Sequence, residues 1–160
     1  QHLLADGARS GRAEVVAAYR ETLELAGDVD RGRTKFRAVC AACHRLEGVG
    51  HQIGKDLQAI RERSAESILV SILDPNREVD PAYVNYVALT SDGRAASGYI
   101  AAETAVSLTL KRADDASDTL LRRDIEQLQS SGMSIMPEGL EKELSKQDLA
   151  DLIAYLRGRR

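Results

Sequence analysis

Apolar residues recur every three or four positions in four segments of the chain, a spacing that places them on one face of an α-helix. The pattern predicts helices over residues 13–26, 31–39, 64–73 and 145–156. Residues suited to helix ends flank them: Ser64 and Ser145 can act as N-caps, and Asp148 completes a capping box with Ser145. Gly27 suits the C-terminal cap of the first helix.

The helix over residues 31–39 carries Gly32 and Phe36 on one face. Because glycine has no side chain, Gly32 would let another helix approach closely, and Phe36 would fill the space beside the contact. Asp28 and Asp30 can cap this helix at its positive N-terminal end. We expect the C-terminal helix to cross here.

Beyond residue 83 the pattern changes to alternation, which is typical of β-strands. Strands are predicted over residues 83–90, 95–102, 106–111 and 119–125. Ser91-Asp92-Gly93-Arg94 is a turn sequence between the first two. We expect a small antiparallel sheet of three or four strands, followed by an irregular segment over residues 130–139 and the last helix.

The composition favours a domain with a large non-protein body in its core. One Phe, five Tyr and no Trp among 160 residues leave few large side chains to fill a single core. The formal net charge of −3 argues against general nucleic-acid binding. No run of 18 apolar residues occurs, so the sequence predicts no transmembrane helix.

The chemistry centres on Cys40-Ala41-Ala42-Cys43-His44, a C-x-x-C-H motif. This pattern is typical of covalent attachment of a c-type haem. Two thiols about one helical turn apart can add across the two vinyl groups of one porphyrin, and the imidazole that follows can reach its iron. The sequence therefore predicts one covalently attached haem c, held by Cys40 and Cys43, with His44 as an iron ligand.

A C-x-x-C redox disulfide and half of a zinc site are the alternatives for the two cysteines. A thioredoxin-type motif needs a βαβ context, and a structural zinc site needs four ligands. The sequence has no further cysteine and only two further histidines, so haem is the better hypothesis. Thioether attachment takes place outside the cytoplasmic membrane. We therefore expect a periplasmic or otherwise exported protein, whose start at Gln1 is that of a mature chain or an excised domain.

Three glycines, Gly48, Gly50 and Gly54, mark the segment after His44 as an irregular loop that passes close to a flat surface. A haem-ligating imidazole usually donates its second N–H to a backbone carbonyl. We expect a carbonyl near Gly54 or Lys55 to accept this hydrogen bond.

The second axial position of the iron could be filled by Met133, Met136, His51 or His2, or left open. His51 lies on the loop expected on the proximal side, and His2 lies at the chain terminus. A thioether paired with histidine stabilises ferrous iron, although both methionines could be ordinary core residues. Pro137 stiffens the backbone beside Met136. We predict Met136 as the ligand, with Met133 packing nearby.

Together these sequences resemble a class I cytochrome c. The similarity rests, in chain order, on Gly27–Gly32, Phe36, Cys40–His44, Met136-Pro137 and the C-terminal helix. The long gap before Met136 and the run Ser131–Leu140 resemble more narrowly the planctomycete-type haem-binding domain, which often ends an exported dehydrogenase-like protein. Lys55 stands where such cytochromes commonly have proline, and no Trp is present to contact a haem propionate.

The resemblance implies a mainly α, cytochrome c-like helical haem domain with a small antiparallel β insertion between the two axial ligands. The expected domains are a lead-in with a packing or linker helix (residues 1–29), a cytochrome c core (30–82 and 129–160) and the β-sheet insertion (83–128).

The implied function is electron transfer through a His44/Met136 haem rather than an enzymatic reaction. The expected partners are redox proteins: a fused or docked dehydrogenase as donor, and another cytochrome or an oxidase as acceptor. The alternative is a haem enzyme or gas-binding sensor with a displaceable distal Met; a third hypothesis is a docking module with haem as structural filler. A basic docking patch or an ordinary solvated helix face would equally explain Arg31, Arg33, Lys35, Arg37, Arg157, Arg159 and Arg160.

Overall fold

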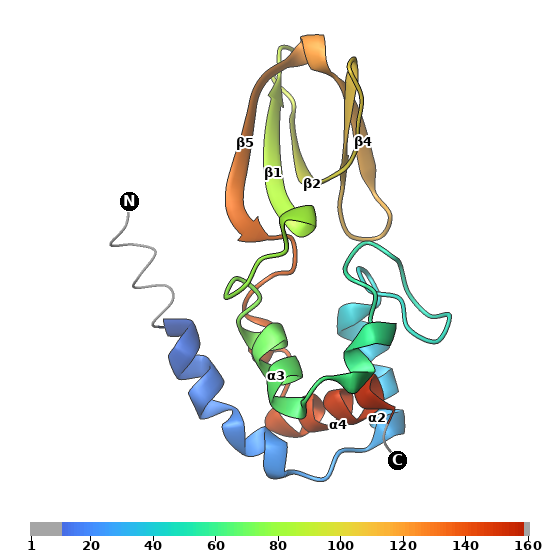
Figure 1. Ribbon diagram of the computed structural model, residues 1–160, viewed down its shortest axis with the longest axis vertical. Coiled ribbons are helices and arrows are strands. Elements are labelled where there is room, and N and C mark those ends of the chain that lie inside the picture. Colours follow the sequence, from blue (N-terminus) through green and yellow to red (C-terminus); the bar gives the residue numbers. More distant parts are fainter. Residues whose placement is uncertain (1–10, 159–160) are drawn as a thin grey trace. The chain divides into compact units, whose positions relative to one another are not determined.

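The computed structural model describes residues 11–158, which divide into two compact units. The described part of the helical unit comprises residues 11–40, 56–77 and 137–158. The sheet unit comprises Ala41–Lys55 and Glu78–Met136. Figure 1 shows the helices of the first unit and the strands of the second. The chain passes from one unit to the other four times: after Cys40, inside the C-x-x-C-H motif, and after Lys55, Arg77 and Met136.

The helical unit is built from short helices. They are the helix over residues 11–18, the 3-10 helix Arg20–Glu24, α2 (Val29–Lys35), the π-helix Phe36–Cys40, the 3-10 helix Gln58–Glu62, α3 (Ala65–Leu73), the 3-10 helix Leu140–Lys142 and α4 (Lys146–Arg157). The predicted N-caps are confirmed, because side chains of Asp28, Ser64 and Ser145 accept backbone hydrogen bonds at the starts of α2, α3 and α4. None of the described helices combines the length and the apolar character needed to cross a bilayer.

Helices α2 and α4 cross at Gly32, as predicted. A methyl group on Gly32 would lie 2.0 Å from the Asp151 carbonyl oxygen and 2.8 Å from Tyr155 Cβ, so only glycine permits this approach. Phe36 is fully buried, and its ring centroid lies 5.6 Å from that of Tyr155. Gly27 also lies against α4 instead of capping the first helix, which ends at residue 18.

A buried carboxylate ties the start of α2 to α4. Asp151 is only 1% exposed, and its oxygens accept hydrogen bonds from the Asp28 N–H at 2.8 Å and from Arg31 Nε at 2.7 Å. Gln147 Nε2 donates a further bond at 2.9 Å. Burial alone would raise the pKa of Asp151, but the bonds from Arg31, the Asp28 N–H and Gln147 outweigh it and hold this pKa below its ordinary value.

The residues described in the sheet unit form one antiparallel sheet of five strands in the order β4-β3-β2-β1-β5. The strands are β1 (Val84–Thr90), β2 (Ala95–Glu103), β3 (Ser107–Lys111), β4 (Ser117–Leu121) and β5 (Ile125–Ser134). Short 3-10 turns, Pro81–Tyr83 and Arg122–Asp124, precede β1 and β5. Every neighbouring pair of strands runs antiparallel, so the unit grows by successive hairpins until β5 returns to the far side of β1.

One face of the sheet forms its own hydrophobic core. The buried residues of this core are Ala88 on β1, Leu108 and Leu110 on β3, and Leu120 on β4. Because β2 and β3 separate β1 from β4, a core shared by these strands requires the sheet to curl. The β2–β3 ladder shifts its register after Ile100, and such an irregularity increases the local bend.

The prediction of a mainly α fold with a small β insertion is wrong. Helices account for 41% of the residues and strands for 26%, and the sheet has its own core. The chain is therefore an α+β protein whose sheet unit is comparable in extent to its helical unit. Alternation indicated β1, β2, β3 and part of β4, but short strands carry no local sign that they bury a common core.

The largest local difference concerns the segment after residue 121. The predicted strand over residues 119–125 is interrupted by the turn Arg122–Asp124. Residues expected to be irregular instead complete β5, which pairs with β1 from Ile125 to Ser134. Almost every residue of β5 is exposed, so its sequence lacks the alternation that would have predicted a strand.

Candidate functional site

The C-x-x-C-H motif begins at the end of the π-helix and continues as a turn over residues 41–43. The segment that follows, residues 45–55, is called here the proximal loop, and it folds back onto the motif. The Ala41 carbonyl accepts a hydrogen bond from the His51 N–H at 2.9 Å, and the Cys43 carbonyl accepts one from the Gly54 N–H at 2.7 Å. Backbone groups of the motif are therefore held by the proximal loop.

Two glycines allow this close contact, as the sequence predicted. Gly50 has φ of +90°, and a methyl group there would lie 2.2 Å from the His44 carbonyl oxygen. Gly54 lies against the imidazole of His44, where a methyl group would come within 2.5 Å of Cε1 and 2.9 Å of Nδ1. The flat surface that Gly54 faces is the ring of the histidine itself.

The orientation of the His44 ring is fixed by Lys55. Nδ1 of His44 lies 3.1 Å from the Lys55 carbonyl oxygen. A carbonyl can only accept, so Nδ1–H donates, and Nε2 of the neutral ring carries a lone pair. Burial lowers the pKa of His44, against the effect of the Lys55 bond, and so favours this neutral ring. The predicted acceptor near Gly54 or Lys55 is confirmed, even though lysine replaces proline there.

This arrangement fits a covalently attached haem. The imidazole is oriented by a backbone acceptor, as iron-ligating histidines are, and Nε2 is left for the metal. Cys40 and Cys43 are half-buried and are not joined to each other. Burial raises the pKa of the Cys43 thiol, and the negative charge of Asp114 raises it further. Across residues 11–158, no three His, Cys, Asp or Glu side chains gather as a metal site, so the zinc alternative has no ligand set there.

The two methionines lie in different surroundings. Met133 belongs to β5 and is 54% exposed. Met136 follows the strand and is half-buried, and its N–H donates to Ser134 Oγ at 3.1 Å. Met136 is thus the less exposed of the two methionines.

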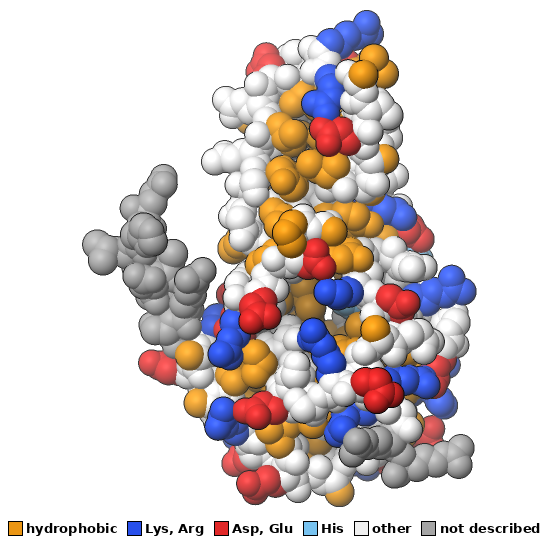
Figure 2. Space-filling model, in the orientation of Figure 1, with side chains coloured by type: hydrophobic (Ala, Val, Ile, Leu, Met, Phe, Trp, Pro, Cys, Tyr) orange, Lys and Arg blue, Asp and Glu red, His pale blue; other side chains and the backbone are white. Residues whose placement is uncertain are grey.

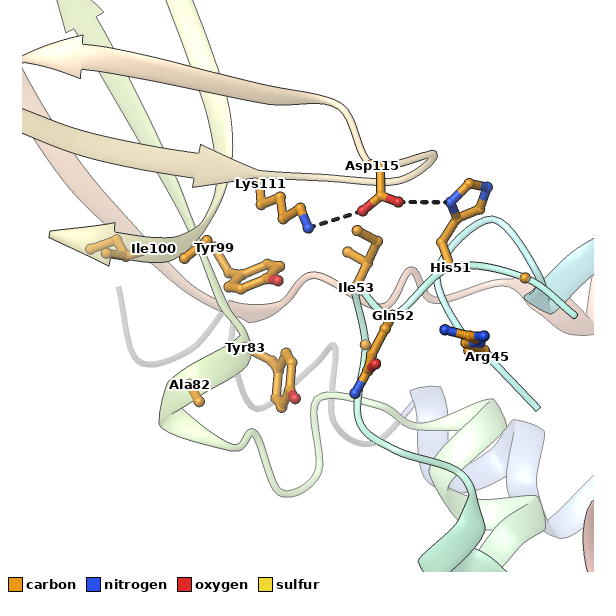
Figure 3. Close-up of a pocket in the computed structure, with 13 residues that line it drawn as sticks. Arg45, His51, Gln52, Ile53, Ala82, Tyr83, Tyr99, Ile100, Lys111 and Asp115 are labelled. Carbon is orange, nitrogen blue, oxygen red and sulfur yellow. Dashed lines mark hydrogen bonds and ion pairs between the residues drawn. The ribbon is translucent and has the colours of Figure 1, made fainter. Parts of the chain in front are cut away.

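His51 is engaged by the sheet. Its Nδ1 pairs with Asp115 Oδ2 at 3.0 Å, and Lys111 Nζ pairs with Asp115 Oδ1 at 2.9 Å (Figure 3). Hydrogen bonds from Lys111 and then from His51 lower the pKa of Asp115. Sequence reasoning missed this cluster, because no local pattern links His51 to a carboxylate 64 residues away. His2, the other histidine considered as a ligand, lies outside the described residues.

A pocket of about 590 Å³ lies beside the proximal loop, within the sheet unit (Figure 3). Ile53 and Gly54 line it from the loop, and Tyr83, Tyr99 and Lys111 line it from the sheet side. The two tyrosine rings pack with their centroids 5.6 Å apart. No sequence pattern indicated this pocket, since its walls come from segments that are distant in the chain.

The basic residues of α2 do not form a uniform positive surface. The ion pairs are Arg31 with Asp151 at 2.7 Å, Arg33 with Asp30 at 3.4 Å, and Lys35 with Asp148 at 3.0 Å. Figure 2 shows Lys and Arg intermixed with Asp and Glu on the visible face of the helical unit. These pairs favour the solvated helix face over the basic docking patch. Arg159 and Arg160 lie outside the described residues.

The motif, the oriented histidine and the two thiols define a protein with a covalently attached haem. A family model described as cytochrome c matches residues 29–159. A cytochrome c-553-like protein of Synechocystis sp. is 40% identical to this chain over 50 residues. These residues make up 31% of this chain and 47% of the relative, so the chain spans about half the length of that protein. The chain belongs to the cytochrome c family. Its cofactor is a covalently bound c-type haem, and the family's activity is haem-based electron transfer.

Proposed function

We propose that this domain carries single electrons on one six-coordinate haem c. Cys40 and Cys43 would form the thioether bonds to the haem, and His44 and Met136 would hold its iron. When bound, the haem supplies an iron that alternates between the ferrous and ferric states. With both axial positions held by side chains, no position is left for a substrate. The protein therefore contributes orientation, burial and electrostatics.

The observation that carries this proposal is the hydrogen bond from His44 Nδ1 to the Lys55 carbonyl, with Gly54 packed against the ring. A fixed ring with its Nε2 lone pair available needs little reorganisation when it binds iron. The Lys55 acceptor also makes the imidazole a stronger electron donor, which stabilises ferric iron. A ligand of this kind suits a redox centre that must change oxidation state without moving.

Three features support Met136 as the sixth ligand. It is half-buried whereas Met133 is 54% exposed, and it lies beyond the end of β5. Its N–H is bound by Ser134 Oγ, and Pro137 follows directly, so the backbone on both sides is restrained. A weak thioether ligand needs such restraint to remain on the iron.

Substitution of each methionine tests the ligation. Met136→Ala in the oxidised holoprotein should abolish the far-red sulfur-to-iron absorption band and let the ferrous protein bind carbon monoxide. Met133→Ala is the matched control, and it should leave both properties unchanged. Retention of the band in Met136→Ala would refute the assignment. Ready binding of carbon monoxide by the unsubstituted protein would favour the gas-binding sensor or haem enzyme instead.

The domain organisation follows from the same proposal. Residues 30–82 and 129–160 supply the cytochrome core, residues 83–128 the inserted sheet, and residues 1–29 a lead-in. The start of the family match at residue 29 supports the lead-in. Strands β1 to β4 lie within residues 84–121, which supports the insertion, although β5 runs on to Ser134.

The partners are proposed from the resemblance. The gap between His44 and Met136 and the Ser131–Leu140 run favour the planctomycete-type haem-binding domain, and with it a fused or docked dehydrogenase as electron donor. Another cytochrome or an oxidase would accept the electron. An exported, periplasmic location agrees with thioether attachment outside the cytoplasmic membrane. Reduction of the holoprotein by a candidate dehydrogenase and its substrate, followed by stopped-flow absorbance, tests the donor.

A further inference from the structure

The turn between β3 and β4, residues 112–116, contacts the haem-attachment motif. The Asp114 N–H donates to the Ala42 carbonyl at 2.8 Å. Asp114 and Asp115 both have φ of +58°, a left-handed conformation that few residues other than glycine adopt. The Ala116 N–H donates to the Ala113 carbonyl at 3.2 Å, so the two residues are the centre of a two-residue hairpin turn, where Asp tolerates a positive φ. This conformation directs the N–H of Asp114 to the motif and the carboxylate of Asp115 to the proximal loop.

The carboxylate of Asp115 joins the sheet to the proximal loop. On one side, Lys111 Nζ, from β3 of the same hairpin, lies 2.9 Å from Oδ1. On the other, His51 Nδ1 donates to Oδ2 at 3.0 Å. Figure 3 shows the three side chains in line, with Asp115 between the other two. Lys111 therefore fixes the position from which Asp115 holds His51.

Residues 52–55 lead from His51 to the Lys55 carbonyl, which accepts the hydrogen bond from His44. The His51 N–H donates to the Ala41 carbonyl at 2.9 Å, and the Lys55 carbonyl accepts from His44 Nδ1 at 3.1 Å. The segment from His51 to Lys55 is thus bound to the motif at both of its ends. A change in its position at His51 would be transmitted to the carbonyl that orients the imidazole.

We propose that Asp115 is a positioning residue for His44: through His51 it fixes residues 51–55, and thereby the hydrogen bond from His44 Nδ1 to the Lys55 carbonyl. This inference rests on the proposed function, in which His44 binds the iron. A well-made hydrogen bond increases the electron donation of the imidazole and stabilises ferric iron. The sheet unit thereby tunes the reduction potential of the haem through the β3–β4 turn.

A purely structural role for the ion pair predicts a different result. The side chains of His51 and Asp115 are 41% and 53% exposed, and exposed ion pairs contribute little to global stability. If stabilising the surface were their only role, their removal would change the unfolding slightly and leave the electronic properties of the haem unaltered. The reduction potential and the signals of the ligand ring therefore separate the two roles.

The experiment compares Asp115→Asn with Asp118→Asn in the holoprotein. Asp118 pairs with Arg112 in the same hairpin, so each substitution removes one negative charge from it, with the pairs to His51 and Lys111 in one case and the pair to Arg112 in the other. Asp115→Asn should raise the reduction potential and shift the hyperfine-shifted proton resonances of the His44 ring, whereas Asp118→Asn should do neither. His51→Gln should reproduce the effect, the double variant should add nothing to it, and Asp115→Glu should restore part of it.

Equal shifts of the potential in Asp115→Asn and Asp118→Asn would identify a general charge effect and overturn the proposal. Unchanged His44 resonances in Asp115→Asn would also overturn it, while an intact far-red band in the same protein would leave the axial ligation standing. Absence of that band from the unsubstituted protein would instead reject Met136 as ligand. If Asp115→Asn does not fold, His51→Gln tests the same hydrogen bond from its other side.

Discussion

Gly32 and Gly54 are both positions where a methyl group would not fit, but they serve different parts of the molecule. Gly32 brings two helix backbones together in the helical unit, where a Cβ would lie only 2.0 Å from the Asp151 carbonyl oxygen. Gly54 brings a loop against one side chain in the sheet unit, where a Cβ would lie 2.5 Å from His44 Cε1. The first contact bears on the stability of the fold, and the second bears on the orientation of one side chain, the imidazole of His44.

The largest expected effect comes from Gly32→Ala. The added methyl meets rigid backbone of α4, so the helices must separate and the free energy of unfolding should fall by about 3 kcal/mol. Urea denaturation of the holoprotein measures this change. Gly11→Ala is the control, because no atom lies within 4 Å of a Cβ there, and it should not destabilise the protein. A loss in Gly32→Ala no larger than in the control would remove the close crossing as an explanation.

Asp151 tests the same crossing through charge. Replacing it with Ala leaves the Asp28 N–H without its acceptor and should lower the free energy of unfolding by about 2 kcal/mol. The pKa of Asp151 in the fold lies below its unfolded value, so the carboxylate stabilises the fold above the unfolded pKa. That contribution should begin to fall at about pH 4, the ordinary pKa of an aspartate, and should be gone once the pH is below the lowered pKa of Asp151 in the fold.

Denaturation curves between pH 7 and pH 3 therefore check the sign of this effect. The unsubstituted protein should lose more stability over this range than Asp151→Ala, since the variant lacks the titrating group. Asp151→Asn should be intermediate in stability and share the flatter pH dependence of the alanine variant. Parallel pH profiles for all three proteins would show that the carboxylate is not linked to folding.

Gly54→Ala should change the free energy of unfolding least. Of these substitutions, it should change the reduction potential of the haem most. A methyl group would push the loop off the His44 ring and weaken its bond to Lys55, at a stability cost of about 1 kcal/mol. Gly48→Ala is the matched control: it lies in the same loop with φ of +80°, but no atom is within 4 Å of its Cβ. The reduction potential should move in Gly54→Ala and stay constant in Gly48→Ala. A common shift would show that loop strain, rather than contact with the ring, sets the potential.

The parts of the structure that the sequence predicted are those set by short, fixed spacings. Asp28, Ser64 and Ser145 cap helices because their side chains reach the backbone N–H three residues ahead. The acceptor at Lys55 followed from the nature of a ligating histidine and the position of the glycine loop. Gly32 and Phe36 indicated a helix crossing because they share one helix face.

The parts that could not be predicted depend on long-range pairing. β5 is an exposed edge strand, and its polar sequence becomes a strand only because β1 is there to pair with it. Asp115 looked like one of several acidic turn residues, and its contact with His51 exists only once the hairpin is folded. The exposure of Met133 has the same origin, since membership of β5 decides where its side chain points.

On the proposed ligation, the β1–β5 ladder would decide when Met136 can reach the iron. Val84 pairs with Ser134, and the Ile135 N–H donates to the Tyr83 carbonyl at 2.9 Å, so the long excursion of the chain closes on itself. Before this ladder forms, Met136 lies at the end of a flexible loop and its approach to the iron carries the full entropy of loop closure. Helices made of local contacts form sooner than such non-local strand pairs. On the same ligation, His44 would hold the iron first, and Met136 would join it only once the sheet has closed.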